Sequence, residues 1–165
     1  MRQIVIIAHD IRSTHNVGSL LRTADGLDAK VWLTGYTPYP KKEKDIRLPH
    51  LTNKIHNQIK KTALGAEKGK GWSHTENIED VIQELADDGF EIICLEQHEN
   101  SIDLPDYKPP GKVAIIIGRE VEGISKTIID QCEKIVEIPM YGDKESYNVV
   151  ESATMALYHC RFFKS

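Results

Sequence analysis

The feature that most constrains the fold is a set of short, almost uninterrupted apolar segments at residues 3–8, 90–95 and 112–117. The last of these, Lys-Val-Ala-Ile-Ile-Ile, is the most apolar. A strand with one face in solvent alternates apolar and polar residues, whereas a strand buried on both faces is apolar throughout. Strands of the second kind belong to parallel sheets that helices cover on both faces, so the sequence predicts an α/β fold.

Segments with apolar residues at helical spacing separate these strands, and we expect five or six parallel strands alternating with helices. A chain of 165 residues with 40% hydrophobic content can form one sizeable core, so we expect a single domain over residues 1–165. The predicted helices cover 17–27, 53–64, 77–88, 125–132 and 149–163, and three further predicted strands cover 30–34, 72–74 and 134–138.

Several classes of protein are disfavoured by the composition. No apolar run approaches the length of a membrane span, and the chain begins in a strand without a signal peptide, so we expect a cytoplasmic protein with no membrane partner. The three cysteines, Cys94, Cys132 and Cys160, have no C-x-x-C spacing, and the seven histidines lack metal-ligand spacing. We therefore expect neither a disulfide framework nor a metal site.

The charge is unevenly distributed. The whole chain has a formal net charge of −4, but residues 41–70 contain nine Lys or Arg against three acidic residues, which leaves −10 on the remainder. Such a cluster is typical of a phosphate-binding patch, although a solvated lysine-rich loop has the same composition. The cationic residues that we expect to contact phosphate are Lys41, Lys42, Lys44, Arg47 and Lys61.

Three loops follow predicted strands at Leu95, Gly118 and Ile138, and in parallel sheets ligands bind beyond the carboxyl ends of the strands. Gly118 and Gly123 allow a sharp turn and close approach of the backbone to a ligand, although an ordinary strand-to-helix turn has the same glycines. Ser146 opens the last helix, where it either helps to hold a ligand or simply caps the helix.

Glu120 lies inside this tight turn, and an acid buried there must find a hydrogen-bond donor. The partner that we expect is Asn16 or Arg22. Without such a role, Asn16 would be a helix cap and Arg22 a solvated helix residue.

Three segments, 16–24 (Asn-Val-Gly-Ser-Leu-Leu-Arg-Thr-Ala), 118–123 and 138–149, together resemble the three motifs of the SpoU family. These are the TrmH-like members of the SPOUT class of RNA 2'-O-methyltransferases, and the resemblance covers nearly the whole chain. It implies a C-terminal trefoil knot, S-adenosylmethionine as cofactor and methylation of a ribose 2'-OH in tRNA or rRNA. Because so small a core offers little surface for RNA, a homodimer is also expected.

The resemblance also implies roles for individual residues. A guanidinium is always protonated in proteins, so we expect Arg22 to bind a phosphate and orient the hydroxyl rather than act as a base. Tyr147 and Val150 depart from the family pattern, which has Leu and a small polar residue there. The implied catalytic residues are Arg22, Asn16, Glu120, Ser146 and Asn148, with Arg22 also touching RNA. The implied cofactor-binding residues are Leu95, Gln97, Gly118, Glu120, Gly123, Ile138, Met140, Ser146 and Tyr147.

Two other functions compete with this one. An inactive RNA-binding protein on the same fold would not need all five polar catalytic groups. A nucleotide-binding α/β protein would normally carry G-x-G-x-x-G after its first strand or a P-loop, and this chain has neither.

Overall fold

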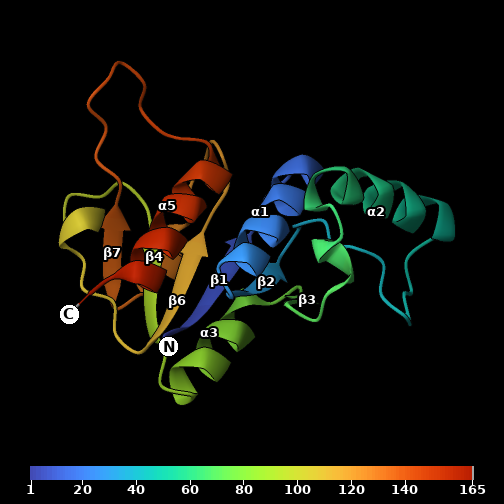
Figure 1. The fold of residues 1–165 in the computed structure, drawn as a ribbon, viewed down its shortest axis with the longest axis horizontal. Helices are drawn as coiled ribbons and strands as arrows, with labels where there is room; N and C mark the ends of the chain where they lie inside the picture. The colour runs from blue at the N-terminus through green and yellow to red at the C-terminus, as the bar shows by residue number, and fades with distance from the viewer. Residues whose placement is uncertain (165) are drawn as a thin grey trace.

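The computed structural model describes residues 1–164, and its centre is one seven-stranded sheet in the order β3-β2-β1-β6-β4-β7-β5 (Figure 1). All six strand pairings are parallel, which confirms the predicted α/β class. The short strand β5 lies in a segment that we predicted as a loop. The strands are β1 (Gln3–His9), β2 (Lys30–Thr34), β3 (Trp72–Thr75), β4 (Glu91–Leu95), β5 (Ile102–Asp103), β6 (Lys112–Ile117) and β7 (Lys134–Glu137).

Five α-helices and two short 3-10 helices, Ala66–Lys68 and Leu104–Asp106, connect the strands. The helix predicted at 125–132 is only four residues long, and the one predicted at 53–64 starts earlier, with a proline in its first turn. Proline lacks an amide donor, which the first turn of a helix does not need. The helices are α1 (Thr14–Gly26), α2 (Pro49–Ala63), α3 (Ile78–Asp87), α4 (Lys126–Ile129) and α5 (Val149–Phe162).

Asn16 and Ser146, which the sequence offered as possible helix caps, are not the caps of α1 and α5. Ser13 caps α1, because its Oγ accepts a hydrogen bond from the Asn16 amide at 3.2 Å, so Asn16 lies inside the first turn. Asn148 caps α5, with its Oδ1 accepting from the Val150 amide at 2.8 Å. Ser146 is therefore not the cap, and both Asn16 and Ser146 have side chains available for other contacts.

The core has two parts, one on each face of the sheet. In β1, Ile4, Ile6 and Ala8 pack with α1 and α5, whereas Val5 and Ile7 pack with α3 and the segment before α4. Alternate residues of a strand point to opposite faces, which explains why the buried strands are apolar throughout. Figure 1 shows α1 and α5 side by side, with α3 apart from them in the lower part of the view.

Because the strands are parallel, the loops after β1, β4, β6 and β7 all leave the same edge of the sheet. The segment between β7 and α5 extends far beyond this edge in Figure 1. Within residues 1–164, no helix combines the length and apolar character needed to cross a membrane. The trefoil knot implied by the family resemblance stays a prediction.

Candidate functional site

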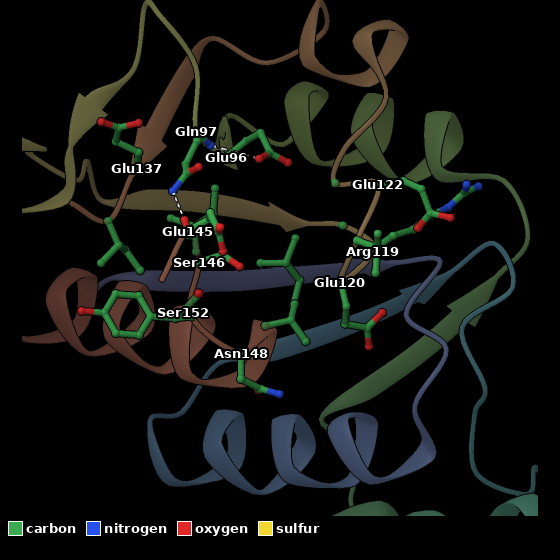
Figure 2. A pocket seen from close by; sticks show the side chains of 18 of the residues that line it. Glu96, Gln97, Arg119, Glu120, Glu122, Glu137, Glu145, Ser146, Asn148 and Ser152 are labelled. Carbon is green, nitrogen blue, oxygen red and sulfur yellow. Dashed lines mark hydrogen bonds between the residues drawn. The ribbon is translucent and has the colours of Figure 1, made fainter. Parts of the chain in front are cut away.

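A cavity of about 570 Å³ opens at the carboxyl edge, between the loops that follow β4, β6 and β7 (Figure 2). Its position agrees with the rule that ligands bind beyond the carboxyl ends of parallel strands. The structure brings all nine predicted cofactor-binding residues to the lining of this cavity. They are Leu95, Gln97, Gly118, Glu120, Gly123, Ile138, Met140, Ser146 and Tyr147.

The turn after β6 is built on its two glycines. Gly123 has φ +67°, which favours glycine, and its amide donates to the Arg119 carbonyl at 3.1 Å. A Cβ on Gly118 would lie 2.8 Å from the Gly123 carbonyl oxygen and 2.6 Å from Ile124 Cγ1. We predicted that Gly118 allows both a sharp turn and close approach of the backbone to a ligand. A side chain at this position would collide with the turn itself, so its absence permits the turn to close, and the approach to a ligand stays a prediction.

A polar chain at the mouth of the cavity joins the three sequence motifs. The Asn16 Nδ2 donates to Glu120 Oε1 at 3.0 Å, and the Asn148 Nδ2 donates to Asn16 Oδ1 at 3.4 Å. Of the two partners predicted for Glu120, the structure therefore shows Asn16 and not Arg22. Glu120 itself is exposed, so burial does not require this hydrogen bond. In Figure 2, Glu120 and Asn148 both point toward α1, which carries Asn16.

The loop before α5 is tied to the loop after β4. The Gln97 Nε2 donates to the Glu145 carbonyl at 2.6 Å, shown as a dashed line in Figure 2. This bond places Ser146 and Tyr147 over the cavity, and both side chains are exposed toward its mouth. The departure at Tyr147 therefore leaves a large ring beside the site instead of an aliphatic side chain.

The cavity is strongly acidic. One cationic side chain, Arg119, lines it together with five carboxylates, so the lining favours a ligand with positive charge and disfavours a polyanion. The sequence interpretation selected only one of these acids. Most of the other acids could have been found from the sequence, because they lie within a few residues of the end of a predicted strand. The five are Glu96, Glu120, Glu122, Glu137 and Glu145.

Three of the five predicted catalytic residues, Glu120, Ser146 and Asn148, line this cavity. Asn16 does not line it but is bonded to Glu120 and Asn148, whereas Arg22 neither lines the cavity nor bonds to its lining. Arg22 is exposed on α1 and has no hydrogen-bond partner among the residues that the structure describes. Its proposed contact with RNA stays a prediction.

The basic segment after β2 has two kinds of cation. Lys41, Lys44 and Lys61 are exposed, whereas Lys42 is half-buried and donates to the His74 carbonyl at 3.3 Å. The three lysines are accessible to a phosphate, which is consistent with a nucleic-acid surface.

Arg47, also predicted to bind RNA, is held within its own chain. Its side chain is only 16% exposed, pairs with Asp45 at 2.5 Å, and donates to the Tyr39 and Pro40 carbonyls at 3.1 and 3.2 Å. The guanidinium also lies 3.6 Å from the centre of the Tyr39 ring. The hydrogen bond with Arg47 holds the pKa of Asp45 well below its usual range. Arg47 is therefore an anchor of the loop, and its contact with RNA stays a prediction that these bonds do not favour.

No group of three or more His, Cys, Asp or Glu within residues 1–164 is arranged to hold a metal ion. Polar and apolar side chains from three loops and from the beginning of α5 line the cavity at the carboxyl edge of the sheet. Comparison with known proteins identifies the class: the model of the SpoU rRNA Methylase family matches residues 3–158, and the chain belongs to this family.

Curated relatives of this chain are described as members of the TrmH family. A protein assigned to the TrmH family of tRNA/rRNA methyltransferases in Staphylococcus epidermidis is 33% identical over 156 residues, covering 93% of this chain and 56% of the relative. A counterpart in Staphylococcus aureus is 31% identical over the same length. The chain thus spans about half the length of the curated relatives it matches.

Solved structures show the same fold. An AdoMet-bound rRNA methyltransferase from Sinorhizobium meliloti superposes with a TM-score of 0.80 at 19% identity, over 96% of this chain and 56% of the other. A TrmH/SpoU tRNA modifying enzyme from A. aeolicus superposes with a TM-score of 0.75 at 21% identity, over 98% of this chain and 75% of the other.

Proposed function

We propose that this chain transfers a methyl group from S-adenosylmethionine to a ribose 2'-OH of tRNA or rRNA. The observation that carries the proposal is the cavity at the carboxyl edge, which two of the family motifs line. Asn16 of the remaining motif joins them through its hydrogen bonds with Glu120 and Asn148. Membership of the SpoU family supports methyl transfer to RNA, and the names of the relatives include both tRNA and rRNA.

The residues of the cavity fit this cofactor. Leu95, Ile138 and Met140 are half-buried and offer apolar surface to an adenine ring. The main chain of the 118–123 turn supplies hydrogen-bonding groups. The surrounding carboxylates favour a ligand that carries a sulfonium and an ammonium group. When bound, S-adenosylmethionine supplies an electrophilic methyl group on its sulfonium.

The chain's own polar groups would then orient the ribose. Asn148 is fixed by two hydrogen bonds, to the Val150 amide and to Asn16, so its amide has a defined direction at the mouth. Ser146 adds a hydroxyl beside it. Holding the 2'-OH in line with the reacting methyl group supplies much of the rate without a strong base. In this proposal Arg22 binds the flanking phosphate.

We propose that the protein acts as a homodimer. Because Arg22 lies outside the cavity of its own chain, a second copy is the simplest source of this residue. An aromatic pair on α5 offers a surface for association: Tyr158 and Phe162 are 59% and 56% exposed, with ring centres 4.7 Å apart. Light scattering of the parent and of Phe162→Glu tests this, and a parent that is monomeric at micromolar concentration would refute it.

The activity is tested in two steps. Calorimetry with S-adenosylmethionine measures cofactor binding, and transfer of a labelled methyl group to bulk tRNA or rRNA measures activity. Mass spectrometry of the digested nucleosides then locates the methyl group on ribose or base. A base methylation would refute the proposed position, and RNA binding without methyl transfer would favour the inactive RNA-binding protein.

A matched pair of variants tests the polar chain. Asn16→Ala removes the partner of both Glu120 and Asn148, so we expect at least a tenfold loss of rate with the fold intact. Asn100→Ala removes an exposed amide outside the cavity lining and should leave the rate unchanged. Equal rates for both variants would remove Asn16 from the site.

A further inference from the structure

The order of the strands places a carboxylate on each side of the turn at residues 118–123. Strand β6, which leads into this turn, lies between β1 and β4. The residue directly after β1 is Asp10, and the residue directly after β4 is Glu96. Both therefore lie at the carboxyl edge, next to the turn that carries Glu120.

Asp10 holds the beginning of the turn. Its Oδ2 accepts two hydrogen bonds from Arg119, at 2.7 Å from Nη2 and 3.2 Å from Nε, and its Oδ1 accepts from the Tyr36 amide at 2.8 Å. The carboxylate is buried, with 6% of the residue exposed. Burial alone would raise the pKa of Asp10, but the bonds from Tyr36 and Arg119 outweigh it and lower the pKa.

The backbone around Asp10 is adapted to this arrangement. Asp10 has φ +56°, which few residues other than glycine adopt. Gly35, beside it in the turn after β2, has φ +64°, and a Cβ there would lie 2.1 Å from Asp10 Oδ1. The fold thus accepts an unusual backbone conformation and excludes a side chain in order to seat this carboxylate.

Glu96 holds the end of the turn. Its Oε2 accepts from the Ile124 amide at 3.0 Å, and its Oε1 accepts from the Gln97 amide at 3.0 Å. A Cβ on Gly123 would lie 2.4 Å from Oε2, so the glycine permits the approach. Both oxygens therefore face donors of the protein itself, although Glu96 also lines the cavity.

We propose that Asp10 and Glu96 form a carboxylate clamp that fixes the 118–123 turn and thereby positions Glu120 against Asn16. Neither residue acts on the substrate in this proposal, and its consequence for methyl transfer rests on the proposed function. The clamp belongs to the chain alone, so it should hold the turn before any cofactor binds.

The clamp can be opened by nearly isosteric substitutions. A carboxylate only accepts hydrogen bonds, and all four of these oxygens face N–H donors. In Asp10→Asn or Glu96→Gln, the new NH₂ group must face one of those donors. Asp130→Asn is the matched control, because it removes a carboxylate from an exposed ion pair with Lys126 that lies outside the clamp.

Hydrogen exchange of the cofactor-free protein tests the clamp directly. For Asp10→Asn and Glu96→Gln, we expect the Gly123 and Ile124 amides to exchange at least about tenfold faster than in the parent. The Ile124 amide donates to Glu96 itself, and the Gly123 amide donates to the carbonyl of Arg119, the residue whose side chain Asp10 holds. The amides of α3 and the control variant should be unchanged. Unaltered exchange in the turn would overturn the proposal. If Asp10→Asn fails to fold, Arg119→Gln opens the same contact from the more exposed side and decides the question.

A second measurement separates positioning from general stability. If Asp10 acts through Glu120, Asp10→Asn should slow methylation at least about tenfold in the parent but less than twofold in a Glu120→Gln background. If Asp10→Asn slows methylation by the same factor with and without Glu120→Gln, Asp10 does not act through Glu120 and the link is overturned. A parent without any methyl transfer would count against the proposed function alone, because the exchange experiment still decides whether the clamp exists.

Discussion

His74 should make the basic loop sensitive to acid. Its ring stacks on the Tyr39 ring with centres 3.7 Å apart, and the Arg47 guanidinium lies 3.6 Å from the centre of the same Tyr39 ring. Burial, together with the charges of Lys42 and Arg47, lowers the pKa of His74 from 6.5 to about 4, although Asp45 partly opposes this. Protonation would place a further cation in a site that already contains two.

The sign of the effect follows from proton binding. Between pH 6.5 and about 4, the unfolded chain binds a proton at His74 that the folded chain does not. The contribution of His74 to stability is therefore complete above pH 6.5 and falls as the pH is lowered through this window. At about 1.36 kcal/mol per pKa unit the full shift would correspond to about 2 kcal/mol at about pH 5. His74 is partly open to solvent, which screens the neighbouring charges, so acidification should lower the free energy of unfolding by about 1 kcal/mol.

Denaturant unfolding at about pH 7.5 and about pH 5 measures this loss. His74→Phe keeps a ring against Tyr39 but cannot titrate, so its free energy of unfolding should fall by about 1 kcal/mol less than that of the parent over the same interval. His50→Phe, at an exposed position of α2, is the matched control and should follow the parent. The reasoning fails if His74→Phe and the parent lose stability equally.

Three further changes give measurable results. Gly118→Val should lower the free energy of unfolding by about 1–3 kcal/mol, because its side chain meets the turn itself; a stable variant that only loses cofactor affinity would contradict this. Lys41→Glu with Lys44→Glu should raise the Kd for RNA and flatten its salt dependence by roughly 0.7–0.9 per phosphate contact, whereas Arg47→Glu should chiefly lower the melting temperature. Arg22→Lys should bind cofactor normally but methylate slowly at every pH in single-turnover assays, and recovery at high pH would instead favour a base.

The strands and the cavity-lining loops were predictable because their signals are local. The segment 112–117 is apolar at every position after its first residue, and Gly118 and Gly123 bracket a turn. Strand β5 has only two residues, Ile102 and Asp103, which is too short for a pattern. Its strand conformation depends on pairing with β7, a contact that no local sequence signal contains.

The roles of charged residues were less predictable, because they depend on distant partners. Arg47 belongs to a basic run, and only the packing of Tyr39 and Asp45 against it shows that it is an internal anchor. Asp10 and Glu96 follow different strands 86 positions apart, and they meet one turn because β6 inserts between β1 and β4. Sequence spacing alone does not give this order.

The uneven charge of the chain is easier to understand with the sites in view. The cavity is lined by five carboxylates and one guanidinium, whereas the exposed lysines of residues 41–70 lie in and around α2, on the other side of α1 from the loop before α5 (Figure 1). A phosphate inside the cavity would be repelled, and a cationic cofactor on the lysine-rich surface would be repelled as well. Under the proposed function, RNA phosphates would remain outside the cavity, and only a ribose would approach the polar groups at its mouth.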